Sequence, residues 1–454
     1  MRYHLLSVLA VFFLFTGSVI GGQKRPNIIY VIVDDMGYGD LSCYGQKHYK
    51  TPNLDRMAAQ GIRFTDAYSG STVCAPARST IMTGQHTGHT PLRVNGGGAP
   101  LPSEVVTLAE ILKQAGYATG GFGKWGLGDV DTEGVPEKQG FDRFFGYYDQ
   151  VHAHNYYSSF LVDTGKRYDI DPKLPADKRH SQNIIFEEMK NWIRKHKDEP
   201  FFCYAPWTPP HAQYQIPEND PAWVAVKNKN WPQRTKGHAA FNLMVDRHVG
   251  ELFELLEELG IDDETIVFFS SDNGASMRND GTLNSCGPLR GFKRSMHEGG
   301  LRVPFIVRWP GHIKSGQVSD LPIYFPDLMP TFAELTGSSK FVPKTIDGLS
   351  FAPTLLGKGK QKRHEFMYWE WSRKQLQRGV RHGKWKLVQK KKAWEVYDLS
   401  TDIGETKDLA ANHGDLIRRV EAWVARNRTE PPRLFDPRGE NGKAFRTPKE
   451  AVTK

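Results

Sequence analysis

The stretch PNIIYVIVDD, residues 26–35, decides the fold class of this chain. Its apolar and β-branched residues follow one another without polar alternation, which is typical of a strand buried on both faces of a parallel sheet. The stretch TIVFFSSDNG, residues 265–274, has the same plan: an apolar strand that ends in an acidic turn. Helical and strand patterns alternate over about 300 residues. The sequence therefore predicts an α/β fold with a large mixed, mostly parallel sheet sandwiched by helices.

The other elements of this fold follow from periodicity and from punctuation by proline and glycine. Thr51 is a potential N-cap, and Gly61 a stop signal, for a helix that lies between them. Residues 118–128 are predicted as a strand that runs into a glycine-rich loop. Periodicity predicts three more helices and one more strand, at residues 105–116, 180–200 and 248–260 for the helices and 201–207 for the strand.

A change in composition divides the chain into two units. Residues 345–364 are rich in glycine, lysine and proline, which marks a domain boundary. Beyond it, residues 379–400 resemble short antiparallel strands, and residues 414–428 resemble one closing helix. We therefore expect a large domain at residues 23–345, a small α+β domain at 346–434 and a polar tail at 435–454.

The N-terminal residues have the order of a secretory signal peptide. Arg2 precedes an apolar stretch from Leu5 to Ile20, and small residues follow. An uncleaved membrane anchor is the alternative, but about 16 apolar residues are fewer than the ~20 that a spanning helix needs. Residues 1–22 are therefore predicted to be a cleaved signal peptide. The mature protein is expected to be exported, periplasmic or secreted, without a membrane span.

The chain is basic, with a formal net charge of +9 and a pI near 9.1. Such a charge favours anionic partners. Nucleic acid is one of these, but the sequence has no helix-turn-helix, zinc finger or aromatic RNA-binding motif. A sulfated or phosphorylated substrate fits the charge equally well, and a merely basic surface is the third interpretation. We therefore expect no nucleic-acid partner.

Two acidic pairs occupy equivalent places in the predicted sheet. Asp34 and Asp35 end one strand, and Asp272 and Asn273 end another. Ligands of open parallel sheets bind outside the carboxyl ends of the strands. Three carboxylates that converge there would repel one another unless a cation lay between them, and oxygen donors favour Ca²⁺ or Mg²⁺ over zinc. The alternative is that these residues only form turns and caps.

Cys74 lies in the stretch STVCAPARSTIMTG, and nothing in the spacing of the four cysteines pairs it with another. Because Pro76 favours the first turn of a helix, Cys74 is predicted at a helix N-terminus, where amide groups attract anions. Arg78 adds a permanent positive charge about one turn later. Three further basic side chains lie in loops after strands or turns, and with a cation they would form a trap for a tetrahedral oxyanion: Lys124, His211 and Lys293.

At this point a family resemblance emerges. CAPARSTIMTG matches the Cys-x-Pro-x-Arg signature of type I sulfatases, and the VDD, GKW, PH, SDNG and GPLRGFK…EGG motifs follow in the family's order. Over residues 25–345 the chain resembles this family, most of all its arylsulfatase and N-acetylgalactosamine-6-sulfatase branch. The C-terminal WKLV…YDLSTDIGE is similar to the family's small second domain. The resemblance implies an alkaline-phosphatase-like fold and a sulfuric ester hydrolase.

The resemblance also implies a chemistry. In this family a formylglycine-generating or anaerobic sulfatase-maturating enzyme oxidises the signature cysteine, here Cys74, to formylglycine. One hydroxyl of the hydrated aldehyde attacks sulfur, and the other lets the bound sulfate be expelled. By the same resemblance, Arg78 and Lys124 would hold the hydrated aldehyde, while His211 and Lys293 would bind the sulfate and assist the leaving oxygen. One Ca²⁺ would be bound by Asp34, Asp35, Asp272 and Asn273.

One residue departs from the family pattern. The family loop is commonly Gly-Lys-Trp-His-Leu-Gly, whereas this chain has Gly126 in place of the histidine that assists sulfate expulsion. His152 or His154, about twenty-five residues later, would fill this gap or bind the sugar; the alternative is that both are surface histidines. Arg93 and Asn95 are further candidates for sugar contacts.

Family likeness favours a sulfated carbohydrate of the galactose or N-acetylgalactosamine type as the substrate. Two alternatives stay open at this point. A phosphatase or phosphodiesterase of the same superfamily typically uses serine or threonine and histidine-bound zinc ions, which the all-oxygen set disfavours. A non-enzymatic, Ca²⁺-dependent glycan binder is supported by Gly126 but opposed by the intact basic residues.

Overall fold

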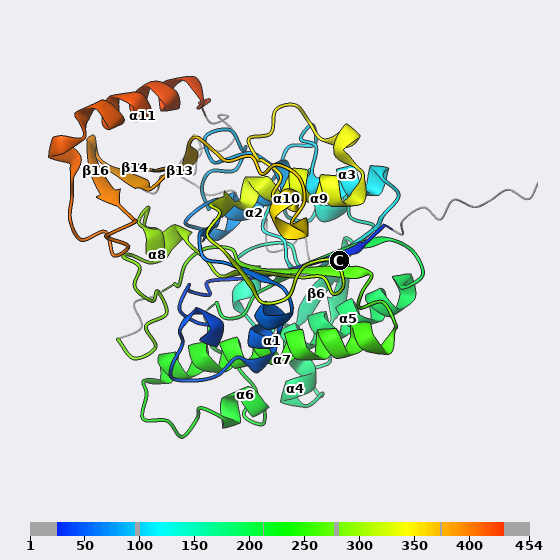
Figure 1. Ribbon diagram of the computed structural model, residues 1–454. Coiled ribbons are helices and arrows are strands. Elements are labelled where there is room, and N and C mark those ends of the chain that lie inside the picture. Colours follow the sequence, from blue (N-terminus) through cyan, green and yellow to red (C-terminus); the bar gives the residue numbers. More distant parts are fainter. Residues whose placement is uncertain (1–24, 96–99, 212, 277–280, 373–374, 431–454) are drawn as a thin grey trace, which may run out of the picture.

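The computed structural model describes residues 25–95, 100–211, 213–276, 281–372 and 375–430 (Figure 1). The predicted signal peptide and polar tail therefore lie outside the described residues. Within the described part, no helix has both the length and the apolar character needed to cross a membrane.

A ten-stranded mixed sheet forms the centre of the molecule, and its middle strands are parallel. β1 pairs in parallel with β8 on one side and β9 on the other, and β4 pairs in parallel with β8 and β5. Antiparallel strands lie toward both edges. This confirms the predicted mixed, mostly parallel sheet. The order is β11 (Gln317–Ser319), β2 (Ile62–Phe64), β10 (Phe305–Arg308), β9 (Thr265–Ser271), β1 (Asn27–Val33), β8 (Phe201–Trp207), β4 (Ala118–Lys124), β5 (Arg143–Tyr147), β6 (Phe160–Asp163), β7 (Lys166–Asp169).

Helices cover both faces of this sheet (Figure 1). All seven residues of β1 are buried, and alternate side chains enter two different cores. Ile28 and Ile32 belong to one core and Ile29 to the other, because successive side chains of a strand point to opposite faces. One face carries α2 (Cys74–Thr83), α3 (Leu108–Gln114), α9 (Leu328–Thr336) and α10 (Ala352–Leu356); the other carries α1 (Pro52–Gln60), α5 (Ser181–His196) and α7 (Gln233–Glu258).

The helix α7 begins fifteen residues before the expected start at residue 248. The added turns contain Gly237, whose Cα lies so close to Tyr214 that a Cβ there would meet the Tyr214 Cβ at 2.3 Å. Glycine weakens a helix locally and is typical of loops, but here it permits close packing of the helix against Tyr214. Tertiary contact therefore extends the helix beyond what the local pattern indicates.

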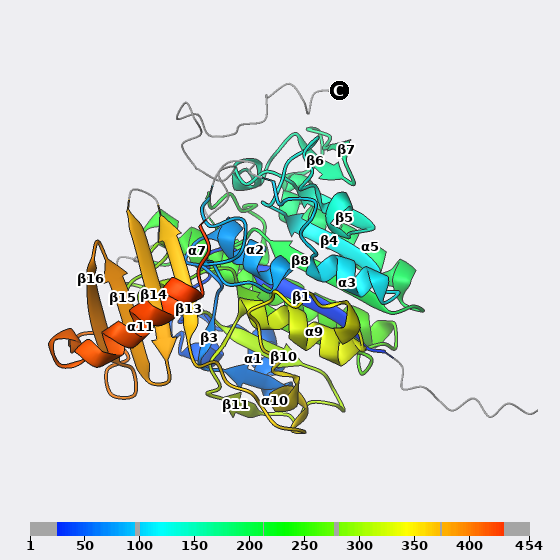
Figure 2. The same cartoon turned by 90° about the horizontal axis from the view of Figure 1, so that it is seen from above.

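The C-terminal unit is a four-stranded antiparallel sheet with one helix packed across it, as predicted (Figure 2). Val380 and Leu387 of the sheet share a small core with Val420 and Val424 of the helix. Its elements are β13 (Met367–Ser372), β14 (Leu376–His382), β15 (Trp385–Lys390), β16 (Ala393–Asp398) and α11 (Gly414–Arg426).

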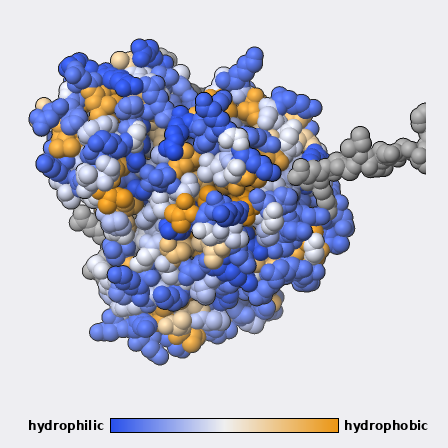
Figure 3. All heavy atoms as spheres, viewed as in Figure 1, coloured by the Kyte–Doolittle hydropathy of each residue, from blue (hydrophilic) through white to orange (hydrophobic). Residues whose placement is uncertain are grey.

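The segment between the units packs with the large one. Phe351, which precedes α10, makes edge-to-face contacts with Phe64 and Phe305 of the large sheet. Residues 346–356 were expected in the second domain, and we now propose that the boundary lies between Leu356 and Met367. The surface of the face drawn in Figure 3 is mostly hydrophilic, with small apolar patches, as expected for a folded chain in water.

Candidate active site

Four neighbouring strands bring the predicted site residues together where the carboxyl ends of these strands meet. β9, β1, β8 and β4 are adjacent and parallel, so their carboxyl ends lie side by side. Asp34 and Asp35 follow β1, and Asp272 follows β9. Lys124 is the last residue of β4, and His211 lies in the loop after β8. The strand order alone therefore gathers these side chains.

Cys74 is the first residue of α2, with its side chain fully enclosed at this end of the sheet. Its Sγ lies 3.2 Å from Asp34 Oδ1 and 3.2 Å from Lys293 Nζ. Asn95 Oδ1 accepts a hydrogen bond of 3.1 Å from the amide of Ala75. Asn95 thus caps the helix end that presents Cys74.

Burial and the negative charge of Asp34 raise the pKa of the Cys74 thiol to about 12. An unmodified cysteine here is therefore protonated at neutral pH and lacks the thiolate that a cysteine nucleophile requires. A reactive cysteine at a helix N-terminus usually has a lowered pKa, so this one differs from that class. The position suits a side chain whose nucleophile is not a thiolate.

Three basic side chains pair with the three carboxylates. Lys124 Nζ lies 2.5 Å from Asp34 Oδ2, and Lys293 Nζ lies 2.5 Å from Asp35 Oδ1. Arg78 donates to Asp272 Oδ2 at 2.9 Å. Burial acts to raise the pKa of Asp34, but the cations, Lys124 foremost, outweigh it and hold this pKa well below its usual range.

The carboxylates are crowded enough to need a further cation. Burial and the nearby Asp34 charge raise the pKa of Asp272 to about 7, in spite of its contact with Arg78. Ligand atoms of Asp34, Asp35, Asp272 and Cys74 all lie within 4.8 Å of one another. The Oδ1 atom of Asn273 is buried without a hydrogen-bond partner. These hard oxygen donors fit a Ca²⁺ ion, which would stabilise the charged carboxylates and satisfy the unpaired amide oxygen.

His154 lies beside the site, and His152 does not. The ring of His154 stacks on that of His211, with centroids 4.5 Å apart and planes 9° from parallel. His211 Nε2 in turn lies 3.5 Å from Asp35 Oδ2. His152 Nε2 instead contacts Ser158 Oγ at 2.7 Å. Of the two histidines considered as replacements for the missing one, only His154 is near the carboxylates.

The structure brings Arg93 into the junction between the two units rather than into the site. Its guanidinium pairs with Glu370 Oε1 at 3.0 Å and donates to the carbonyl and hydroxyl oxygens of Thr429 at 2.6 and 2.8 Å. Its Nε bonds to the carbonyl oxygen of Thr90. Because these partners occupy the guanidinium and its side chain is only 5% exposed, we no longer assign Arg93 to a sugar contact.

The backbone at Gly126 has a conformation that favours glycine over histidine. Gly126 has a φ of +76°, in the region that favours glycine. A Cβ atom there would lie 3.1 Å from Gln150 Cγ. A histidine at this position would therefore be strained unless the loop changed its conformation.

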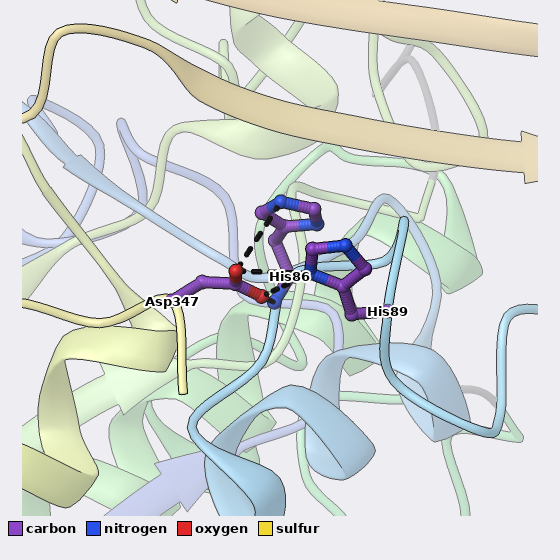
Figure 4. Close-up of side chains that lie close together, drawn as sticks. All are labelled: His86, His89 and Asp347. Carbon is purple, nitrogen blue, oxygen red and sulfur yellow. Dashed lines mark hydrogen bonds and ion pairs between the residues drawn. The ribbon is translucent and has the colours of Figure 1, made fainter. Parts of the chain in front are cut away.

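A second group of metal-ligand side chains, which sequence reasoning missed, lies at the junction of the units (Figure 4). Asp347 Oδ1 lies 2.9 Å from His89 Nδ1 and 3.6 Å from His86 Nε2, and the two rings stack with centroids 4.5 Å apart. The amide of Gly88 donates to His86 Nδ1. The neutral ring therefore carries its proton on Nε2, the atom that faces Asp347, and cannot offer that atom to a metal. The His-x-x-His spacing of residues 86–89 was the only local signal.

A buried side chain at a helix N-terminus, surrounded by cations and by carboxylates that fit Ca²⁺, is an arrangement that suits an enzyme acting on an anionic ester. Comparison with known proteins identifies which one. Residues 26–338 match the sulfatase family model, and residues 291–427 match the model of the C-terminal region of N-sulphoglucosamine sulphohydrolase. The chain belongs to the sulfatase family and is a sulfuric ester hydrolase.

Individual relatives agree with this assignment. Human N-acetylgalactosamine-6-sulfatase is 34% identical over 74% of this chain and 67% of its own length. Human arylsulfatase A is 34% identical over 76% of this chain and 71% of its own. Among solved structures, Ps i-CgsB in complex with k-i-k-neocarrahexaose has a TM-score of 0.79 and 28% identity over 89% of this chain and 94% of its own. The phosphatase and the non-enzymatic binder are not favoured.

Proposed function

We propose that the protein is an exported sulfatase that removes sulfate from a sulfated carbohydrate, with Cys74 converted to formylglycine and one Ca²⁺ held by Asp34, Asp35, Asp272 and Asn273. The observation that carries this proposal is the position of Cys74 between Asp34 and Lys293 at the N-terminus of α2. The modification requires a maturation enzyme as a partner.

The bound Ca²⁺ would polarise the sulfate oxygens, and formylglycine would supply a hydrated aldehyde as nucleophile with a built-in route for sulfate release. The chain's own residues orient the sulfate group and neutralise its negative charge. Lys293 Nζ, in contact with both Cys74 and Asp35, lies where it can bind a sulfate oxygen next to the nucleophile. Arg78 and Lys124, both fully buried, add fixed positive charge near the nucleophile position through their contacts with Asp272 and Asp34.

His211 and His154 form the proposed leaving-group side of the site. Burial lowers the pKa of His211, although Asp35 and Asp34 oppose this. Burial and the adjacent His211 lower the pKa of His154 to about 4. Both rings are therefore neutral at pH 7, and a neutral ring has a nitrogen lone pair that could accept the proton released when sulfate is expelled. We assign the role of the missing histidine to this stacked pair.

The substrate class rests on the relatives. One relative is named an N-acetylgalactosamine-6-sulfatase, and one similar structure is a complex with k-i-k-neocarrahexaose. We propose a sulfated galactose or N-acetylgalactosamine unit for this chain. The protein's formal net charge of +9 supports an anionic glycan.

The first experiment measures chemistry and modification together. Protein co-produced with a maturation enzyme is expected to hydrolyse an aryl sulfate and N-acetylgalactosamine-6-sulfate, and to leave the matched aryl phosphate nearly untouched. The tryptic peptide Phe64–Arg78 is expected to have the mass of an aldehyde at position 74 rather than a thiol. Equal turnover of phosphate, or an ordinary cysteine in fully active protein, would overturn the proposal.

The second experiment compares two histidines. His154→Ala is expected to lower kcat/KM by about 10- to 100-fold through loss of proton transfer. His152→Ala, the matched control, is expected to keep kcat/KM within about threefold, because His152 contacts Ser158 and not the site. Equal effects of the two variants would remove His154 from the mechanism.

A further inference from the structure

A cavity of about 720 Å³ opens where the parallel central strands begin, at the end of the sheet opposite the candidate active site. Arg25 and Pro26, which line it, directly precede β1, and Ala115 lies shortly before β4. Trp309 follows β10, which is antiparallel to β9, so it lies at the same end. With a rise of about 3.3 Å per residue, the length of β1 separates this end from Asp34 by roughly 20 Å.

Basic side chains dominate the charged lining of this cavity. Arg25, Lys340 and Lys358 line it together with His312, whereas Glu334 is the one carboxylate among its lining residues. In the described part of the chain, neither Lys340 nor Lys358 has a carboxylate within 4.0 Å, and both are exposed. The cavity therefore has positive charge that the protein does not neutralise, which attracts an anion.

Aromatic rings contribute to the lining of this cavity. The ring of His312 is exposed and stacks on Trp309, with centroids 4.0 Å apart and planes 18° from parallel. Phe341 is half-buried beside Lys340, whose Nζ lies 4.8 Å from the ring centroid. Flat rings next to cations suit a ligand with an apolar face and negatively charged substituents. A single inorganic anion would use only the cations.

We propose that this cavity is a second, non-catalytic binding site for a sulfated oligosaccharide. The sulfate groups pair with Lys340 and Lys358, and a sugar ring packs on the His312–Trp309 stack. The assignment rests on the proposed carbohydrate substrate for the chemical class of its ligand, but not on catalysis at Cys74. A chain long enough to contact both ends of the sheet is held near the active site, so its effective concentration there increases.

The test compares two double variants of equal charge. Lys340→Glu/Lys358→Glu reverses the cavity lysines, and Lys195→Glu/Lys392→Glu reverses two exposed lysines elsewhere. Both are made in the Cys74→Ala background, and binding of fluorescent chondroitin 6-sulfate oligosaccharides is measured. The cavity variant is expected to lose at least about fivefold in affinity while the control stays within twofold. Equal losses in both, or no loss in the cavity variant, would overturn the proposal.

Two further measurements separate the ligand classes and the two proposals. Inorganic sulfate at the concentration of the oligosaccharide sulfate groups is expected not to compete; full competition would make the cavity a small-anion site and overturn the proposal. His312→Ala is expected to weaken oligosaccharide binding as well. With Cys74 intact, the cavity variant is expected to keep its kcat/KM for an aryl sulfate within twofold. If the protein is not a sulfatase, no variant hydrolyses the aryl sulfate, and the binding measurement still tests the cavity by itself.

Discussion

Two groups of side chains in the described part of this protein have the composition of metal sites, and only one of them fits a metal. In the group formed by Asp34, Asp35 and Asp272, an amide oxygen stays unpaired and the pKa of Asp272 is raised by burial and repulsion. In the group of His86, His89 and Asp347, every nitrogen that faces the carboxylate can donate to it (Figure 4).

The difference shows that residue types alone do not define a metal site. What matters is whether their lone pairs are already used. The carboxylate of Asp347 is satisfied by donors from His86 and His89, and Gly88 fixes the tautomer of His86. The carboxylates at the strand ends are paired with basic side chains, but the pKa of Asp272 is still raised and the Asn273 amide oxygen among them has no partner, so an added cation fits there. The group of His86, His89 and Asp347 therefore stabilises the junction of the two units, while the carboxylates at the strand ends prepare a catalytic centre.

The strongest test of this comparison removes one carboxylate from each group. Asp35 has a φ of +70°, which asparagine tolerates, so Asp35→Asn keeps the backbone. We expect it to lower kcat about a thousandfold or more. The side chain at position 35 would lose its negative charge, and with it both a proposed Ca²⁺ ligand and the ion pair with Lys293. Asp347→Asn, the matched control, is expected to stay within about threefold in kcat and to lose about 1–3 kcal/mol of unfolding free energy. Comparable kcat losses would contradict the distinction.

Removal of the proposed Ca²⁺ ion is expected to have the next largest effect on activity and stability. A chelator is expected to lower Tm and activity, and added Ca²⁺ to restore both, because a ligand that binds only the folded state stabilises it by about 2.7 kcal/mol at a hundred times its Kd. Asp347→Asn should show the same chelator-induced shift in Tm as the unchanged protein, since Asp347 holds no metal in this account. If the chelator-induced shift in Tm disappears in Asp347→Asn, the ion is bound by His86, His89 and Asp347, and the assignment to the strand ends is wrong.

The pH dependence of stability sharpens the comparison further. Burial lowers the pKa of His86 to about 4, despite the opposing charge of Asp347. Unfolded histidine titrates near 6.5, so between pH 6.5 and pH 4 the unfolded state binds a proton that the folded state does not. The contribution of His86 is therefore present above pH 6.5 and is lost as the pH falls, by about 2 kcal/mol between pH 7 and pH 5. In urea unfolding at pH 7 and pH 5, His86→Gln should show a smaller decrease than the unchanged protein; an equal decrease would reject this origin.

The smallest expected effect is that of His89→Ala. His89 is partly exposed, with 23% of its side chain accessible, and its Nδ1 atom contacts both carboxylate oxygens of Asp347. Its loss is expected to cost about 0.5–1 kcal/mol of unfolding free energy and to leave activity unchanged. Urea unfolding with an activity assay measures both. A large activity loss would mean that the junction communicates with the catalytic centre.

Local signals were sufficient for the catalytic side of the molecule. The buried strand before Asp34 and Asp35 and the proline after Cys74 each indicate structure within a few residues. Parallel strands then align their carboxyl ends, so the meeting of Asp34 with Asp272 follows once both strands belong to one sheet. The resemblance to sulfatases added the chemistry that these residues perform.

Other features could not be predicted because they depend on distant contacts. His86 and Asp347 are far apart in sequence and meet only when the segment after α9 folds back over the end of α2. The same holds for Arg93 and Glu370 at the junction. The choice between His152 and His154 depended on which ring stacks on His211, and no spacing rule could decide it.

The sequence by itself determined the sheet, the helix that begins at Cys74, and the charged residues that follow the strands, because periodicity and backbone preferences act over a few neighbours. Only the tertiary structure decided which of these charges remain available. It paired Arg93 with the C-terminal unit, satisfied Asp347, left the amide oxygen of Asn273 unpaired and gave Gly126 a positive φ in which other residues are strained. The physical reason is that hydrogen bonding and desolvation depend on every group packed around an atom, and most of those groups come from elsewhere in the chain.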